Sequence, residues 1–203
     1  MVMYLIPLIG QPSLILQPEI LLIFFLATIL LFTQPVFTKK EAEERQKTDR
    51  FSIYKILLAT SFSQIISIVE WRFTQSHLSS HLDLSLIWPG LIVMLLGIVL
   101  RVWSIRTLGK HFSSLVMMQN QHELIQAGPY KVIRHPSYTG AILAVIGSAL
   151  ILQAFYSLLV IIPLLSWAYR SRIDAEEMTL SSYFGDEYRS YRKHTKKLIP
   201  FIW

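Results

Sequence analysis

Long apolar runs separated by short polar segments dominate this chain. Residues 20–37 carry no charged side chain, and neither do residues 139–169. A helix needs about 20 mostly apolar residues to cross the hydrocarbon core of a bilayer. The apolar runs therefore predict membrane spans over about residues 14–37, 51–69 and 84–105.

Two of these spans have distinctive polar or aromatic positions. Serines recur along residues 51–69 together with Gln64, which suits a helix that packs against other helices rather than against lipid. Trp88 and Trp103 lie near the two ends of the third span, where tryptophan anchors a helix at the membrane interface.

The uncharged run 139–169 is too long for one ordinary span and too short for two spans with a turn. Extended over its helical flanks to residues 136–177, it fits two helices of about 20 residues each. Pro136 suits the first turn of the first helix, and a tight turn is expected near Gln153. We therefore expect an all-α polytopic membrane protein of about five transmembrane helices, the last two forming a helical hairpin.

Composition and charge support this topology. The chain has 203 residues, of which 53% are hydrophobic and 16% charged, with a mean hydropathy of +0.46. Soluble domains carry about 25% charged residues. Five Lys or Arg residues lie in 38–50, five in 101–138 and seven in 170–203, whereas segment 71–83 has only Arg72. Because basic loops stay in the cytoplasm, we expect an outside N-terminus and polar segments that face the cytoplasm.

The net charge of +6 is explained by these membrane-flanking residues and does not indicate nucleic acid. The absence of cysteine excludes disulfides, thiolate zinc sites and a catalytic thiol. His77 and His81 are spaced for a metal but have no third ligand nearby, so no metal is expected. The N-terminus lacks a basic region and a small-residue cleavage site, so we expect the first apolar segment to be retained.

Three polar segments are candidates for chemistry: residues 128–138, residues 172–177 and residues 183–188. The five-span topology places all three at one membrane face, where clustered polar groups can enclose a polar ligand. In the first segment, the N–H groups at the helix start can hold a carboxylate of a methionine-like moiety. The alternative is a simple helix entry, with Arg134 and His135 reaching toward lipid head groups.

The second segment places Arg172 and Glu176 on one helix face, because they are four residues apart. The simpler reading is an intrahelical salt bridge. Alternatively, the carboxylate accepts hydrogen bonds from a ribose and the guanidinium clamps an anionic substrate group. Glu177 is expected to point away and to be solvated. The third segment, in which Phe184 and Tyr188 are expected to share a face, predicts a short amphipathic helix on the membrane surface that can also cover a pocket.

These segments resemble the isoprenylcysteine carboxyl methyltransferase family over about residues 100–201. The resemblance is carried by LRVWSIRTLGKHF, HELIQAGPYKVIRHPSYTG, SRIDAEEMTLSSYFGDEYRSYRKH and the ending LIPFI. In its length, the chain resembles the compact prokaryotic members of that family. It implies one membrane-embedded methyltransferase domain over 1–203, with variable transmembrane helices in 1–99 and the catalytic core in 100–203. The chain lacks both a GxGxxG motif and strand–helix alternation, which excludes the common soluble methyltransferase architecture.

The resemblance implies an S-adenosylmethionine site beside an acceptor site. Arg172 corresponds to the residue that holds the acceptor carboxylate, and Glu176 to the carboxylate on the ribose side of the cofactor. Met117 stands where relatives carry Gln or Glu, and Gln119, two residues on, is counted among the contacts. The cofactor-binding residues that the resemblance implies are Gln119, His122, Glu123, Leu124, Ile125, Tyr130, His135, Pro136, Ser137, Tyr138 and Glu176.

The implied reaction is methyl transfer from S-adenosylmethionine to the carboxylate of a lipophilic, isoprenylcysteine-like substrate in the lipid bilayer. Charge disperses during this in-line displacement, so a dry pocket favours it, and an ionised carboxylate needs no general base. One alternative is N-methylation of a phospholipid amine, which requires a base such as His135 or Glu177. The other is a membrane protein that binds lipid without catalysis.

Overall fold

The computed structural model describes residues 16–32, 52–77, 84–109 and 123–200. Its elements are α1 (Pro18–Phe32), α3 (Ser52–His77), α4 (Leu84–Leu108), the 3-10 helix η4 (Gly128–Lys131), α5 (Pro136–Ile151), α6 (Phe155–Phe184) and α7 (Asp186–His194). Over these ranges the β-structure consists of one isolated parallel bridge, between Ile133 and Lys196. The all-α class predicted from the sequence is therefore confirmed.

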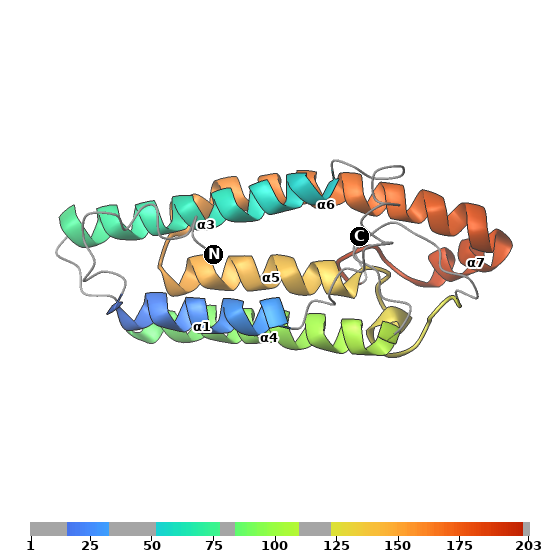
Figure 1. Ribbon diagram of the computed structural model, residues 1–203, viewed down its shortest axis with the longest axis horizontal. Coiled ribbons are helices and arrows are strands. Elements are labelled where there is room, and N and C mark those ends of the chain that lie inside the picture. Colours follow the sequence, from blue (N-terminus) through green and yellow to red (C-terminus); the bar gives the residue numbers. More distant parts are fainter. Residues whose placement is uncertain (1–15, 33–51, 78–83, 110–122, 201–203) are drawn as a thin grey trace.

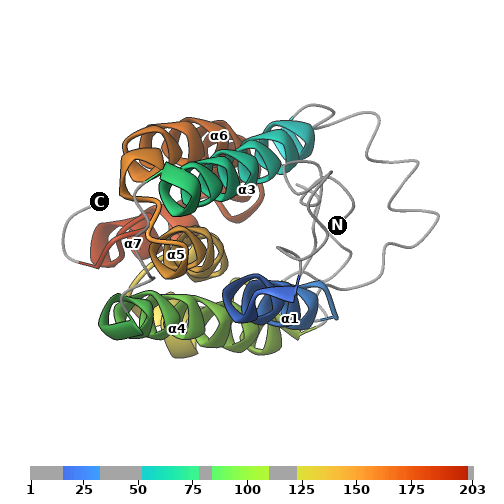
Figure 2. The ribbon, with the colours of Figure 1, turned by 90° about the vertical axis from the view of Figure 1, so that its left-hand side faces the viewer.

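The long helices form an elongated bundle with α5 at its centre. Helices α3 and α6 run side by side along one side of α5, while α4 and α1 run along the other side (Figures 1 and 2). Helix α7 lies at one end of the bundle, beside the far end of α6 (Figure 1). Because α5 contacts α3, α4 and α6, its N-terminal end is fixed from several sides.

The predicted hairpin is confirmed. Helix α5 begins at Pro136 and ends at Ile151, and Gln153 turns the chain with a positive φ of 53°. Helix α6 then begins at Phe155, and Glu70 of α3 accepts the first N–H groups of α6, from Tyr156 at 3.0 Å and Ser157 at 2.6 Å. A carboxylate at this position satisfies donors that the helix itself leaves open, and it complements the positive end of the helix dipole.

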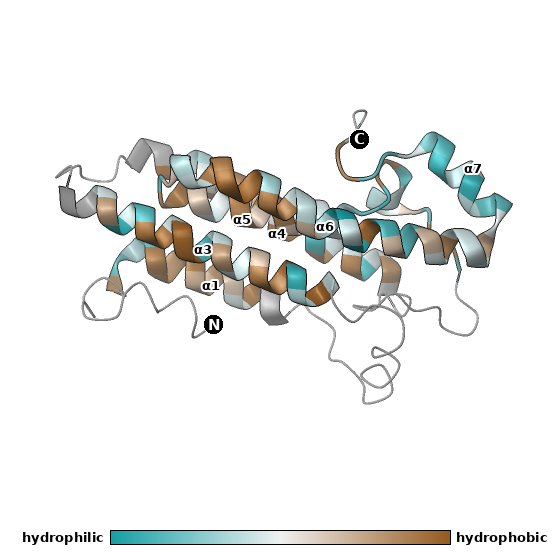
Figure 3. Cartoon of the chain, turned by 90° about the horizontal axis from the view of Figure 1, so that it is seen from above, coloured by the Kyte–Doolittle hydropathy of each residue, from teal (hydrophilic) through white to brown (hydrophobic). Residues whose placement is uncertain are grey.

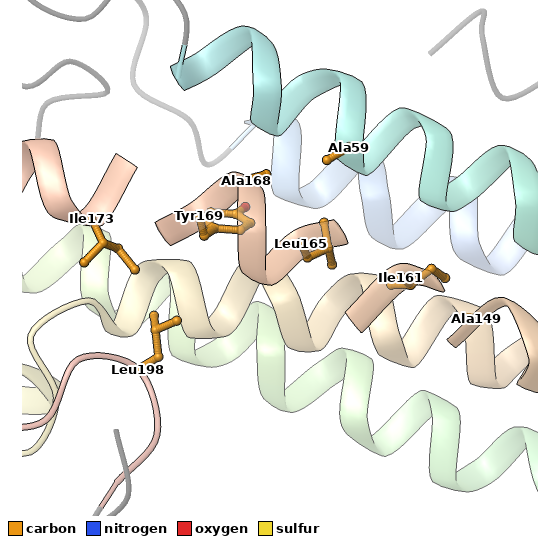
Figure 4. Packing of buried hydrophobic residues seen from close by; sticks show 8 residues of the cluster. All are labelled: Ala59, Ala149, Ile161, Leu165, Ala168, Tyr169, Ile173 and Leu198. Carbon is orange, nitrogen blue, oxygen red and sulfur yellow. The ribbon is translucent and has the colours of Figure 1, made fainter. Parts of the chain in front are cut away.

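Apolar side chains of α6 form the centre of the core. Figure 4 shows Ile161, Leu165, Ala168, Tyr169 and Ile173 of α6 packed together with Ala59 of α3, Ala149 of α5 and Leu198 from beyond α7. The serines of α3 turn toward this bundle, since Ser63 and Ser67 are fully buried and donate to main-chain carbonyls four residues earlier. This burial confirms that the polar face of the second span packs against other helices.

Glycines bring α4 and α5 into backbone contact. A Cβ placed at Gly97 would lie 2.6 Å from both the Ala144 nitrogen and the Gly140 oxygen. A Cβ at Gly140 would lie 2.6 Å from the Gly97 oxygen, so the two glycines face each other. Small residues that allow such close approach are typical of helix pairs in membranes. The contact fixes the N-terminal half of α5 against α4.

Gly97→Ala is therefore expected to destabilise the protein by about 1–3 kcal/mol, because the added methyl group forces the two backbones apart. Leu96→Ala is the matched control, since Leu96 is an exposed neighbour on the same helix. Unfolding of both variants in detergent micelles measures the difference. Equal stability of Gly97→Ala and wild type would show that the α4–α5 contact is looser than described.

Hydropathy separates the bundle from its polar end. Figure 3 shows hydrophobic residues along the bundle and hydrophilic residues over the far end of α6 and over α7. Among the described residues, the stretches Ser52–Thr74 and Ile87–Leu108 are long and apolar enough to cross a membrane, and Pro18–Ile29 and Pro136–Ile151 are shorter apolar helices. The count of five spans remains a prediction.

Candidate functional site

The polar end of the bundle brings the three predicted segments together. The segment before α5 meets the last turns of α6, and α7 with the residues after it closes over both (Figures 1 and 3). Pro136 starts α5 directly after this segment, as predicted, and Ala127 has extended backbone angles just before η4. The candidate site is therefore built around the N-terminal end of α5 and the polar half of α6.

Tyr138 connects Arg172 to Glu176. The Arg172 Nε donates to the Tyr138 hydroxyl at 3.2 Å, and that hydroxyl donates to Glu176 Oε2 at 2.8 Å. Arg172 is buried and also donates from Nη1 to Ser52 Oγ on α3. Glu176 keeps a side chain that is 32% exposed. The predicted pair on one face of α6 is thus joined through an aromatic hydroxyl of α5.

Glu177 is buried, which corrects the expectation that it is solvated. Its Oε1 accepts from Arg134 Nε at 2.8 Å, and both side chains are only 7% exposed. The signal that reveals this position is the spacing of four residues from buried Ile173, which places Glu177 on the buried face of α6. Arg134, not counted among the cofactor contacts in the sequence, is its main partner.

His135 lies between the two adjacent glutamates. Its Nδ1 is 3.6 Å from Glu176 Oε2, and its Nε2 is 3.4 Å from Glu177 Oε1. The imidazole is buried and stacks on the Tyr138 ring, with the planes 8° apart. His135 therefore faces the protein's own carboxylates and contributes to the arrangement of Glu176 and Tyr138.

Glu177 stays ionised at neutral pH. Burial alone would raise its pKa, but hydrogen bonds from His135 and Arg134 outweigh this effect and lower the pKa from 4.5 to about 2. Arg192 of α7 and Lys197 approach its other oxygen, each at 3.8 Å. A carboxylate held in this way is a structural anion and a poor general base.

The residues after α7 pair with the segment before α5. The Arg134 N–H donates to the Lys196 carbonyl at 2.8 Å, and the His135 N–H donates to the Lys197 carbonyl at 3.1 Å. The Lys196 N–H in turn donates to the Val132 carbonyl at 3.2 Å, and the Arg134 guanidinium donates to the Thr195 carbonyl. Sequence reasoning missed this pairing, because isolated bridges lack the alternating pattern of a strand.

Two further predicted cofactor residues, Tyr130 and Ser137, lie beside this network. Tyr130 lies in η4, where its main-chain carbonyl accepts from Tyr191 of α7 at 2.7 Å. Burial raises the pKa of the Tyr130 hydroxyl, and the nearby Glu176 charge raises it further. The Arg101 guanidinium of α4 donates from Nη1 to the Ser137 carbonyl, at 3.0 Å, and to the Ser137 hydroxyl, at 3.1 Å. Arg101 thus holds the start of α5.

The segment containing Glu123, Leu124 and Ile125 directly precedes η4. The predicted contacts Gln119 and His122 lie outside the described residues, as do Met117 and His81. A cavity of about 280 Å³ opens nearby, with Gln126 and Lys131 on one side and residues of α7 and Thr195 on the other. Its lining residues are Gln126, Lys131, Glu187, Ser190, Tyr191, His194 and Thr195.

The short helix after α6 is confirmed, with one correction. Gly185 breaks the chain with a positive φ of 53°, so Phe184 ends α6 and Tyr188 belongs to α7. Tyr188 therefore packs with Tyr191, at 6.0 Å between ring centroids, rather than sharing one helix face with Phe184. Across the described ranges, no group of three His, Cys, Asp or Glu side chains is arranged to hold a metal.

Together, the fold and the site define a helical membrane protein with a buried polar site at one end. A solved structure with this fold is that of a eukaryotic intramembrane Ras methyltransferase, isoprenylcysteine carboxyl methyltransferase. The similarity has a TM-score of 0.59 at 26% identity and covers 99% of this chain and 72% of that one. The family model for isoprenylcysteine carboxyl methyltransferase matches residues 90–182. The chain is therefore similar to the isoprenylcysteine carboxyl methyltransferase family in sequence over residues 90–182 and in fold.

Curated proteins show the same similarity. A probable protein-S-isoprenylcysteine O-methyltransferase of Oryza sativa subsp. indica is 33% identical over 118 residues, which cover 57% of this chain and 61% of the relative. The protein-S-isoprenylcysteine O-methyltransferase of Homo sapiens is 32% identical over 153 residues, covering 64% of this chain and 52% of the relative. The chain thus spans about half to three fifths of the length of these relatives.

Proposed function

We propose that this protein transfers a methyl group from S-adenosylmethionine to the carboxylate of a lipophilic, isoprenylcysteine-like substrate. The observation that carries the proposal is the hydrogen-bonded chain from buried Arg172 through Tyr138 to partly exposed Glu176 at the polar end of the bundle. It places a guanidinium and a carboxylate on either side of one aromatic hydroxyl. The similarity to isoprenylcysteine carboxyl methyltransferases supports the reaction class, and this geometry supports the two binding functions.

The residues present fit S-adenosylmethionine. Glu176 accepts the Tyr138 hydroxyl on one oxygen while its side chain stays partly exposed, which suits a carboxylate that accepts further hydrogen bonds from a ribose. Arg101 and the first turn of α5 form a positive environment suited to an amino-acid carboxylate. When bound, the cofactor would supply the methyl group on its sulfonium.

Arg172 is proposed to hold the acceptor carboxylate. Tyr138 and Ser52 fix its guanidinium from two helices, so the planar fork has a defined direction. A guanidinium so held binds a carboxylate with charge-assisted hydrogen bonds and orients it for in-line displacement. Burial of Arg172 also keeps water from that contact.

The rival reaction, N-methylation of a phospholipid amine, requires a group that removes a proton from an ammonium. Glu177 is unsuited to this role because its pKa is held at about 2 by His135 and Arg134. His135 is buried against the two glutamates rather than facing outward. These contacts favour an acceptor that arrives already ionised.

The purified protein is expected to bind S-adenosylmethionine or its demethylated product in the micromolar range, roughly −8 kcal/mol. Glu176→Gln should weaken this binding, because the amide is neutral and offers one acceptor oxygen where the carboxylate offers two. Asp186→Asn, at an exposed carboxylate of α7, is the matched control. Calorimetry that detects no binding to folded wild type at millimolar ligand would reject the methyltransferase proposal.

The proposed site faces the cytoplasm in an N-out, C-in protein of five spans. The chain has no native cysteine, so single-cysteine labelling reports topology directly. A cysteine replacing the exposed His194 should react with an impermeant reagent only from the cytoplasmic side. Labelling of that position from outside would contradict the hairpin orientation and the location of the site.

A further inference from the structure

Lys197 links the two elements that carry the site, although nothing in the sequence marked it. Its carbonyl accepts the His135 N–H at 3.1 Å, which holds the chain just before α5. Its Nζ donates to Asp174 Oδ1 of α6 at 2.9 Å and lies 3.8 Å from Glu177 Oε2. One residue after α7 therefore contacts both the start of α5 and the polar half of α6.

Arg134 makes the reciprocal link. It extends from the segment before α5 to Glu177 of α6, and it donates to the Thr195 carbonyl after α7. Contacts therefore join three segments to one another: the segment before α5, the polar half of α6 and residues 195–198. Thr139 adds a further hydrogen bond, at 2.8 Å, to the Leu198 carbonyl, and Leu198 itself is buried in the core.

These contacts fix the distance between α5 and α6 at the proposed cofactor site. Tyr138 and His135 lie on the α5 side, whereas Glu176 lies on α6, and the two sides meet through the 2.8 Å hydrogen bond from Tyr138 to Glu176. A shift of about 1 Å between the two elements would break that bond. Because Lys197 is only 21% exposed, its ion pair with Asp174 is partly shielded from water.

We infer that Lys197 is a positioning residue, whose ammonium group acts through Asp174 and Glu177 to hold Glu176 against Tyr138 in the cofactor-binding arrangement. This inference rests on the proposed function. It assigns the four residues 195–198 to the site, where they hold α5 against α6. The acceptor side should be less sensitive, since Arg172 is held by Ser52 of α3 as well as by Tyr138.

The test measures the affinity for S-adenosylhomocysteine by calorimetry, the KM for a prenylated acid acceptor and the melting temperature. Lys197→Met is expected to weaken product binding about tenfold, the scale of one lost charge-assisted hydrogen bond. Lys197→Arg should retain most of the affinity, and the acceptor KM should change less than about twofold. Lys193→Met, at an exposed lysine of α7, is the matched control and should bind like wild type.

The outcomes separate the inference from the proposed function. If wild type binds S-adenosylhomocysteine and Lys197→Met binds it equally well, the positioning role is wrong while the proposed function stands. A loss of cofactor affinity accompanied by an equal rise in the acceptor KM would also overturn the inference, because a general structural role predicts that result. If Lys197→Met fails to fold, Asp174→Asn removes the other half of the pair at a more exposed position, and wild-type binding by that variant would count against the inference.

Discussion

Replacing Glu177 with alanine is expected to lower the free energy of unfolding by about 3 kcal/mol. The substitution removes the partner of buried Arg134 and leaves that guanidinium with Thr195 and a main-chain carbonyl of α7 as acceptors. Glu176→Ala should cost much less stability, because the Glu176 side chain is 32% exposed whereas that of Glu177 is 7% exposed. Denaturant titration in mixed micelles compares the two adjacent substitutions.

The contribution of Glu177 to the free energy of unfolding depends on pH. Its pKa is lowered in the folded protein, so its stabilising contribution is fully present above its ordinary pKa of 4.5 and is lost as the pH falls toward 2. The stability difference between wild type and Glu177→Gln should therefore be constant at neutral pH and should shrink below pH 4.5. Equal stability of the two proteins at neutral pH would mean that the Arg134 pair contributes nothing.

Arg172→Lys is expected to reduce methyl transfer by about ten- to a thousandfold, or roughly 1.4–4 kcal/mol. Lysine keeps the positive charge but loses the planar fork that the proposed acceptor carboxylate requires. Cofactor affinity should change little, since Glu176 is held by Tyr138 as well as by its position on α6. Transfer to a small prenylated acid and calorimetry on the same preparation give both quantities.

The matched control for this change is Arg170→Lys, because Arg170 is an exposed arginine of the same helix. It should leave transfer unaffected. Near-normal transfer by Arg172→Lys, together with loss of cofactor binding in Arg172→Ala, would reject the acceptor role. That pattern would instead assign Arg172 to the support of Tyr138 and Glu176.

The hairpin was predictable because its determinants are local. Pro136 marks a helix start, and the uncharged run fixes where the chain must turn, so the sequence alone placed the turn at Gln153. The α4–α5 contact was not predictable in the same way. Gly97 and Gly140 are far apart in sequence, and only the folded backbone shows that they face each other.

The site was predictable in its segments but not in all its partners. Tyr138, Arg172 and Glu176 meet at one end of the bundle, as the charge pattern and the resemblance suggested together. The angle between Glu176 and Glu177 on a helix predicts a solvated Glu177, whereas its spacing from Ile173 places it on the buried face of α6. Lys197 joins the site through main-chain pairing, which depends on tertiary contact and has no periodic signal.

The central claim is methyl transfer to a carboxylate, and the most direct measurement compares two acceptors that differ at one group. Wild-type protein is given labelled S-adenosylmethionine with a small prenylated thiol-acid, and in parallel with the same molecule carrying a carboxamide. The account predicts label in a base-labile methyl ester of the acid and none on the amide. Equal labelling of both acceptors, base-stable label on a lipid amine, or no transfer to the acid by folded protein that binds the cofactor would contradict it.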